Sequence, residues 1–282
     1  MRYLIAWIFK IIFKIEFFRY YYFALYKRLF RPFNLFKGVT IECKYSDTLR
    51  INADLEDWIQ QNIFFTGVYD SKSVQFVKRA LGEGDTFIDI GANIGCFTLV
   101  GSQKVGRRGR VIAFEPVELV SKKLEKNILL NKLDNVTIVR KAVYDRNTPI
   151  KLHLARHENL GMSSIQRHDS ESGEIINVEA ISLDEYLRKE NINEVKIIKI
   201  DIEGAELPAL IGMDNILSGL KPILMVEVSP EVTKSSKERL RVFDLLCQKN
   251  YERFVIQNDG TLIHPEDEEL IDHSNFVFIQ RS

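Results

Sequence analysis

The chain has 282 residues, of which 45% are hydrophobic and 28% charged, and its formal net charge is zero. This is the composition of an ordinary globular protein that can bury a full core. Its three cysteines are far apart and show no metal-ligand spacing, which argues against a disulfide framework and a zinc site. We therefore expect a protein of the reducing cytoplasm.

The charge is unevenly spread along the chain. Residues 1–38 hold eight basic side chains and one acid, a net charge of +7, so the remainder carries −7. This arm is also apolar and aromatic, but it is interrupted by charges at Lys10, Lys14, Glu16 and Arg19. A spanning helix needs about 20 mostly apolar residues, and a secretory signal needs an uninterrupted apolar stretch with a cleavage site. We expect neither.

Two interpretations of the arm remain open. In the first, residues 1–35 form a helix in the headgroup region of an anionic membrane, where basic and aromatic side chains both gain. In the second, the arm packs on the domain or on another subunit, and its charges are solvated. In either case we expect a helical extension over residues 1–60 and a larger domain over residues 61–282.

From about residue 75 onward, helical and strand patterns alternate. Short apolar runs predict buried strands at 86–90, 111–114, 136–139, 195–200 and 222–228. Helices are predicted at 73–81, from about 93, and at 118–130, 182–188, 205–217 and 237–249. Two short antiparallel strands are expected near 150–154 and 176–178, and two further strands, 251–257 and 275–280, close the chain.

Regular alternation of strands and helices predicts a mostly parallel sheet with helices on both faces. The fold class is therefore α/β, doubly wound, with a seven-stranded sheet that ends in an antiparallel pair. In such sheets ligands bind beyond the carboxyl ends of the strands, where the strand order reverses. The residues that follow the strands are therefore the candidates for a functional site.

The first strand ends in an acid, Asp89, followed by two glycines four residues apart, Gly91 and Gly95. Glycines let the backbone turn tightly and approach a ligand, and a carboxylate accepts hydrogen bonds from a cationic group. The dinucleotide motif G-x-G-x-x-G has a glycine where this chain has Asn93, and its pyrophosphate would lie near Asp89. The motif therefore favours a ligand with an ammonium group over a dinucleotide.

The second strand ends in Glu115, which precedes Pro116. A carboxylate at this place can accept hydrogen bonds from both hydroxyls of a ribose. Sites for nicotinamide dinucleotides share this feature, so Glu115 supports an adenosine ligand without choosing between cofactors.

More acids follow the fourth and fifth strands. Strand alternation places Lys199, Asp201 and Glu203 on one side, and Glu227 lies beside Asp201 if the two strands are neighbours. Such acids need the lysine, a bound cation or a cationic ligand to offset their repulsion. A general base is the favoured interpretation of the pair, and a divalent metal is the less favoured one.

Together these segments resemble the FkbM-type methyltransferases, which use S-adenosylmethionine and are built on a Rossmann-like sheet. The resemblance runs from about residue 67 to 280, and residues 199–206 are its most specific part. Its other pieces are residues 67–70, 87–97, 114–116, Asn127, Asn131, 142–145, 161–165 and 182–184.

The resemblance departs from the family pattern at Asp70, where a glutamate is expected after Tyr69. It implies a site for S-adenosyl-L-methionine, whose residues are grouped here by the part of the cofactor that they would contact. The implied residues are Asp89, Gly91, Asn93 and Gly95 for the methionine part, Glu115 for the ribose, Ala142 and Asp145 for the adenine edge, and Tyr69 and Asp201 on the methionine or acceptor side; Ala92 and Pro116 complete the cofactor-binding set.

The resemblance also suggests that an oxygen accepts the methyl group. A hydroxyl needs a base or a metal near the methyl group, and we assign the role of base to Asp201 with Glu203 and Glu227 as helpers. The expected acceptor is a hydroxyl of a small molecule or glycan; the basic arm alone suggests a membrane-bound sugar precursor.

Two functions remain as alternatives to a methyltransferase: a nicotinamide-dependent oxidoreductase and a non-catalytic adenosyl-binding protein. A nucleic acid partner is not expected, because the core is acidic and the basic residues lie in an apolar arm.

Overall fold

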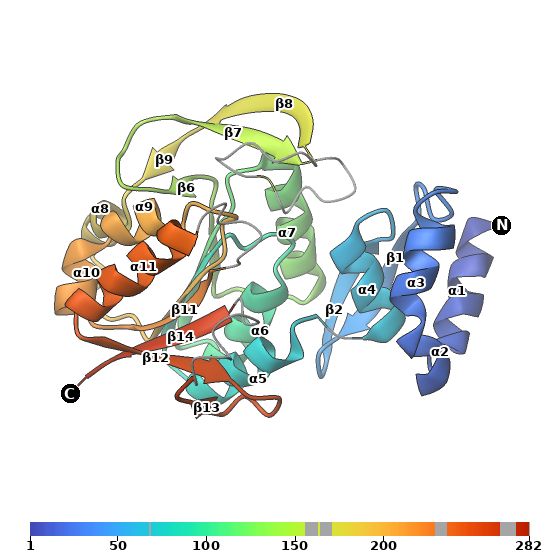
Figure 1. Cartoon of the computed structure of the whole chain (residues 1–282), viewed down its shortest axis with the longest axis horizontal. Helices are drawn as coiled ribbons and strands as arrows, with labels where there is room; N and C mark the ends of the chain where they lie inside the picture. The colour runs from blue at the N-terminus through green and yellow to red at the C-terminus, as the bar shows by residue number, and fades with distance from the viewer. Residues whose placement is uncertain (68, 156–162, 164–170, 229–235, 266–274, 282) are drawn as a thin grey trace. The chain divides into compact units, whose positions relative to one another are not determined.

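The computed structural model describes residues 1–67, 69–155, 163, 171–228, 236–265 and 275–281. Internal contacts divide these residues into two units, an N-terminal unit of residues 1–70 and a larger unit that begins at Ser71 (Figure 1). The predicted boundary at residue 60 lies inside a helix of the N-terminal unit. Each unit is described by itself.

The larger unit is built on a sheet that has eight strands within the described residues, in the order β13-β12-β14-β11-β10-β3-β4-β5. The five strands from β11 to β5 run parallel, whereas β14 is antiparallel to β11 and β12, and β12 is antiparallel to β13. The strands are β3 (Thr86–Ile90), β4 (Arg110–Phe114), β5 (Val136–Val139), β10 (Ile197–Ile200), β11 (Ile223–Glu227), β12 (Tyr251–Ile256), β13 (Leu262–Ile263) and β14 (Asn275–Gln280).

This architecture confirms the predicted doubly wound, mostly parallel sheet with a terminal antiparallel pair. The seven expected strands are all present, and the eighth is the two-residue edge strand β13. Helices cover both faces (Figure 1). They are α5 (Ser71–Ala80), α6 (Cys96–Val105) and α7 (Glu118–Leu130) on one face, and α8 (Leu183–Lys189), α9 (Glu206–Ile211), α10 (Asp214–Gly219) and α11 (Ser236–Gln248) on the other.

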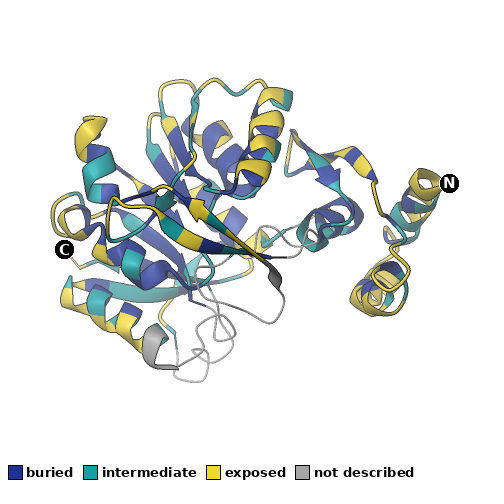
Figure 2. Cartoon of the chain, turned by 90° about the horizontal axis from the view of Figure 1, so that it is seen from above, coloured by how far each residue is buried: buried dark blue, intermediate teal, exposed yellow. Residues whose placement is uncertain are grey.

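The two central strands, β3 and β10, are buried on both faces, as their continuous apolar runs predict (Figure 2). Ile88 and Ile198 belong to the hydrophobic core shared with helices α8 to α11. Phe87 points to the other face, where its ring lies directly under Gly101 of α6. The strand order reverses between β3 and β10, so a binding site is expected at their carboxyl ends.

Two small sheets stand apart from the main one. Strand β7 (Ile150–Ala155) pairs antiparallel with β8 (Glu171–Val178), which confirms the predicted pair of short strands. Strand β6 (Ala142–Val143) pairs parallel with β9 (Ala180–Ile181).

The N-terminal unit contains a hairpin as well as helices. Strands β1 (Thr40–Tyr45) and β2 (Leu49–Asp54) pair antiparallel and alternate between buried and exposed side chains, a pattern that the sequence analysis did not recognise. No helix within the described residues is both long and apolar enough to cross a membrane. The helices are α1 (Arg2–Ile12), α2 (Glu16–Tyr20), α3 (Tyr22–Leu25), the π-helix η1 (Tyr26–Phe30) and α4 (Trp58–Thr66).

The single helix predicted over residues 205–217 is in fact two helices, α9 and α10, which are separated at Gly212. A Cβ atom at this glycine would lie 2.1 Å from the carbonyl oxygen of Tyr144. The backbone at Gly212 also accepts a hydrogen bond from the N–H of Asp184, at 3.1 Å. Contacts from segments distant in sequence therefore interrupt the helix.

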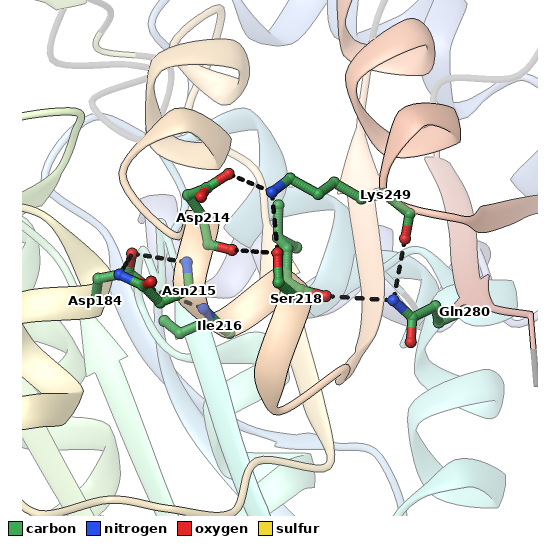
Figure 3. A network of polar contacts seen from close by, with 8 residues as sticks. Asp184, Asp214, Asn215, Ile216, Ser218, Lys249 and Gln280 are labelled. Carbon is green, nitrogen blue, oxygen red and sulfur yellow. Dashed lines mark hydrogen bonds and ion pairs between the residues drawn. The ribbon is translucent and has the colours of Figure 1, made fainter.

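The second helix is capped by Asp184, a residue of α8. Its carboxylate accepts hydrogen bonds from the backbone N–H groups of Asn215, at 2.9 Å, and Ile216, at 3.0 Å (Figure 3). Lys249 pairs with Asp214, the first residue of α10, and donates to the hydroxyl of Ser218, near the end of the helix, at 2.9 Å. A distant side chain thus satisfies N–H groups that a new helix leaves free.

We expect Gly212→Ala to lower the free energy of unfolding by about 1–3 kcal/mol, because the added methyl group overlaps the carbonyl of Tyr144. The matched control is Gly219→Ala, where a Cβ meets nothing within 4 Å, and its effect should stay within about 0.5 kcal/mol. Denaturant unfolding measures both. Equal effects of the two substitutions would contradict this account of the break.

Candidate active site

The turn after β3 is in direct contact with the backbone that follows β10. The N–H groups of Gly91 and Ala92 both donate to the carbonyl oxygen of Phe114, at 3.0 Å, which ties the turn to β4. Gly91 has a φ of +76°, and a Cβ there would lie 1.8 Å from the backbone oxygen of Asp201. Only glycine fits such a conformation at such a distance.

The turn stays in the left-handed region at Asn93, with a φ of +51°, and at Gly95, with a φ of +100°. Gly95 is the N-cap of α6, so the helix begins at Cys96 rather than near Asn93 as predicted. A Cβ at Gly95 would lie 2.6 Å from the side chain of Leu124 on α7. Residues 91–95 therefore form a tight loop that directs backbone groups to the carboxyl edge of the sheet.

Lys199 lies at the centre of the site and connects β10 with the turn. Its Nζ is 3.4 Å from Asp89 Oδ1 and 3.2 Å from Asp201 Oδ2, and it donates to the carbonyl oxygen of Gly91 at 2.9 Å. The side chain is only 5% exposed. Burial by itself would lower the pKa of Lys199, but the charges of Asp201 and Asp89 outweigh burial and raise that pKa.

Asp89 is fully buried, and its carboxylate is engaged within the protein. The hydroxyl of Thr98 donates to Asp89 Oδ2 at 2.6 Å, whereas Oδ1 has no hydrogen bond within the described residues and faces only the ammonium of Lys199. Asp89 thus fixes the position of Lys199. Its predicted contact with the methionine part of the cofactor is not tested by this geometry and stays a prediction.

Glu115 organises the neighbouring loops. One of its carboxylate oxygens accepts the N–H of Asn93 and the other accepts the N–H of Val117, both at 3.0 Å. Burial raises the pKa of Glu115 to about 7, although these hydrogen bonds and the charge of Lys199 act in the opposite direction. Each oxygen has a second lone pair, so Glu115 can still accept a hydroxyl of a ligand.

The segment after β10 is an acidic loop with strained backbone. Glu203 has a φ of +54°, a conformation that costs about 1–3 kcal/mol for a residue other than glycine and that is found mainly at functional sites. The buried carboxylate of Glu206 stabilises the loop, because its Oε1 accepts the N–H groups of Ile202, at 3.3 Å, and Gly204, at 3.1 Å. Burial raises the pKa of Glu206 to about 7.

Burial and the negative charges of Asp201 and Glu206 raise the pKa of Glu203. The charge of Asp201 therefore acts on the Glu203 carboxyl, although Glu203 lies beyond the last residue of β10.

Asp201 and Glu227 form a pair of carboxyl groups. Strands β10 and β11 are neighbours in parallel register, with Ile200 beside Val226, so the residues that end them lie together. The negative charge of Asp201, followed by burial and a hydrogen bond between the two side chains, raises the pKa of Glu227 well above its ordinary value. The raised pKa favours the neutral form of the Glu227 carboxyl, which is hydrogen-bonded to Asp201.

The charge of the site suits a cationic ligand. Carboxyl groups lie at or near the ends of four adjacent strands, and the charge of Asp201 is the main cause that raises the pKa of Glu227, whereas burial is the main cause at Glu115 and Glu203. A ligand with a sulfonium and an ammonium group would reduce this repulsion. Among the described residues, no group of three or more His, Cys, Asp or Glu side chains is arranged to hold a metal ion.

The remaining predicted residues are less closely associated with this centre. Ala142 lies half-buried in β6, Pro116 follows Glu115 in the loop before α7, and Asp145 pairs with Arg146 at 2.7 Å. Tyr69 belongs to the N-terminal unit. Their cofactor roles stay predictions. Val68 and all of the 161–165 segment except Ser163 lie outside the described residues.

One buried polar residue of the site was missed. Thr98 lies in the first turn of α6, where it faces β3 and holds Asp89. Its signal in the sequence is weak: a single hydroxyl three residues after the capping Gly95, in an otherwise apolar stretch.

The match to a family model identifies the chain. The model of the methyltransferase FkbM domain matches residues 89–253, more than half of the chain. The chain belongs to the FkbM methyltransferase family, as the sequence analysis predicted, and its cofactor is S-adenosyl-L-methionine. A nicotinamide-dependent oxidoreductase is thereby set aside.

Known relatives are distant. The chain is 27% identical over 183 residues to Methyltransferase 1 of Beauveria bassiana, which covers 58% of this chain and 70% of that protein. It is 25% identical over 186 residues to Methyltransferase sdnD of Sordaria araneosa, covering 56% and 69%. It is 24% identical over 247 residues to AMB antimetabolite synthetase AmbE of Pseudomonas aeruginosa, covering 75% of this chain but only 11% of that protein.

Solved structures are similarly remote. A methyltransferase FkbM from Methylobacillus flagellatus has a TM-score of 0.46 at 14% identity, covering 77% of this chain and 52% of that one. A SAM-dependent O-methyltransferase from Thermotoga maritima has a TM-score of 0.42 at 17% identity, covering 76% and 67%. Likeness at this level carries no argument about the reaction.

We expect Lys199→Met to lower the free energy of unfolding by about 3–5 kcal/mol at neutral pH, because it leaves buried carboxylates without their cation. Since the pKa of Lys199 is raised above 10.5, its contribution is fully present at neutral pH and is lost only in strongly alkaline solution. Denaturant unfolding at neutral pH measures the loss. The control is the exposed Lys196→Met, and a loss as large in that variant would refute the assignment.

Proposed function

We propose that this methyltransferase methylates an oxygen, and that its acceptor is a hydroxyl group of a sugar, a glycolipid or polysaccharide precursor, or another small molecule. The observation that supports the proposal is the Asp201–Glu227 pair beside Lys199, at the carboxyl edge of the sheet. A hydroxyl is a weak nucleophile until its proton is leaving, so it needs such a base.

Asp201 is the base in this proposal. It is the more exposed partner of the buried Lys199, with 21% of its side chain accessible, so it can accept the hydroxyl proton of an acceptor. Lys199 holds the carboxylate in place, and the raised pKa of the neighbouring Glu227 favours its neutral form, which limits the charge that accumulates there. Glu203 adds to the negative field around the acceptor.

The bound cofactor supplies an electrophilic methyl group, and the protein must place the acceptor oxygen in line with it. The loop from Gly91 to Gly95 and the carboxylate of Glu115 would hold this cofactor, because both lie at the carboxyl ends of the central strands. The acids around Asp201 favour its positive charge.

We also propose that the enzyme acts in the cytoplasm, with peripheral contact to the inner face of the membrane through residues 1–35. A nucleic acid acceptor does not suit this chain, because its basic residues gather in the apolar arm while the remainder is acidic.

Calorimetric titration should show binding of S-adenosylhomocysteine and no binding of NAD. In the same experiment, Glu115→Gln should weaken S-adenosylhomocysteine by about ten- to a hundredfold, because a charged acceptor of ribose hydroxyls is lost. The exposed Glu118→Gln on α7 is the matched control and should bind normally. Binding of NAD in place of S-adenosylhomocysteine would reject the cofactor site.

We expect Asp201→Asn to lower the rate of methyl transfer by about 10²–10⁴-fold without loss of S-adenosylhomocysteine affinity, because it removes the base. Transfer of labelled methyl groups to glycolipid and polysaccharide fractions identifies an acceptor and measures the rate. The exposed Asp134→Asn should transfer at the normal rate. Full turnover by Asp201→Asn would show that the base lies elsewhere, and binding without any transfer would favour a non-catalytic adenosyl-binding protein.

A further inference from the structure

Helix α1 is apolar on two faces, only one of which is covered. On the inner face Ala6 and Phe13 are buried, and the ring of Phe9 lies 4.8 Å from that of Phe30. On the outer face an apolar stripe at helical spacing is exposed, comprising Leu4 (65%), Ile8 (47%), Ile11 (62%) and, just past the helix, Ile15 (56%).

Further large apolar side chains are exposed on α2 and α3. Phe17, 64% exposed, contacts the rings of Phe18 and Tyr21, and Tyr21 contacts Tyr20, which is 84% exposed. We call the whole set the outer surface of the N-terminal unit. It comprises Leu4, Trp7, Ile8, Ile11, Ile15, Phe17, Phe18, Tyr20, Tyr21 and Phe23.

Such a surface is unusual for a part of a protein that faces water. Single exposed apolar residues are normal, but apolar patches of neighbouring residues mark places where something binds. Two exposed leucines of the larger unit, Leu119 and Leu129, lie ten positions apart on α7 and illustrate the ordinary case.

The positive charge of residues 1–38 indicates which kind of partner would bind the outer surface. The exposed basic side chains of residues 1–38 are Arg2, Lys14, Arg19, Lys27, Arg28, Arg31 and Lys37. The opposing charge in residues 1–38 is the single acid Glu16, which lies 3.7 Å from Arg19. A second copy of this chain would bring the same positive charge to the contact, and the two surfaces would repel. An anionic surface would attract them.

We propose that the outer surface of the N-terminal unit docks on an anionic lipid bilayer, with α1 lying in the headgroup region. The 11 residues of α1 extend only about 16 Å, half of a bilayer core of about 30 Å, so the helix lies on the membrane rather than across it. Aromatic rings and basic side chains both gain free energy in that region. This deepens the proposed peripheral location and rests on it, but it is independent of the chemistry at Asp201.

The test uses the full chain and vesicles of phosphatidylcholine with or without phosphatidylglycerol. Flotation should recover the protein with the anionic vesicles, and high salt should weaken this binding. The double variant Ile8→Glu with Ile11→Glu should lower the partition constant by about tenfold or more, because it places charges in the stripe. Leu119→Glu with Leu129→Glu is the matched control and should float normally.

Fluorescence of Trp7 provides a second readout. The chain has two tryptophans, so Trp58→Phe leaves Trp7, 46% exposed, as the only reporter. Its emission should shift to shorter wavelength with anionic vesicles and stay unchanged with neutral ones. Titration with S-adenosylhomocysteine checks that each variant is folded and reports on the cofactor site separately.

Three results would overturn the proposal: equal flotation with neutral and anionic vesicles, unchanged flotation of the folded Ile8 and Ile11 variant, or an unshifted Trp7. Sedimentation identifies the competing occupant. A wild-type dimer that Ile8→Glu with Ile11→Glu converts to a monomer, with no vesicle binding by either, would assign the surface to a second copy of the chain.

Discussion

The buried ammonium of Lys199 is the interaction on which the rest of the site depends. It lies between the carboxylates of Asp89 and Asp201 and donates to the backbone of Gly91, so it joins the turn after β3 to the end of β10. A buried lysine is tolerated only where opposite charges outweigh its lost hydration. Here the charges of Asp201 and Asp89 do so, and in return the lysine fixes the positions of both carboxylates.

The parallel sheet explains why so many acids can gather at one edge. Four neighbouring strands end side by side, and each contributes a carboxyl group at its end or, for Asp89 of β3, one residue before it. Two of these acids, Glu115 and Glu206, mainly hold loops through backbone N–H groups. Asp201 and Glu227 instead contact each other through a side-chain hydrogen bond. The same kind of side chain therefore serves as scaffold in one place and as reactive group in another.

Local pattern was sufficient for the strands and for most helices. The bounds of β3, α7, β5 and β14 match the predicted ranges. These elements are apolar runs bounded by turn residues, and both signals are local in the sequence. The break at Gly212 could not be foreseen, since it depends on Tyr144 and Asp184, which lie far away in sequence. Thr98 was missed for the same reason, because its role depends on one hydrogen bond from α6 to Asp89 of β3. The acid cluster was foreseen, but the contact between Asp201 and Glu227 depends on β10 and β11 being neighbours.

The contact between Gly91 and the backbone of Asp201 has a consequence for how this enzyme can evolve. A side chain at position 91 would collide with the main chain at position 201, so no compensating side-chain change at position 201 can make room for it. Substitutions in the two segments are therefore epistatic. The cofactor turn and the acidic loop can change only together, through movements of the backbone. Specificity for new acceptors is therefore expected to arise at other parts of the chain, while this junction stays unchanged.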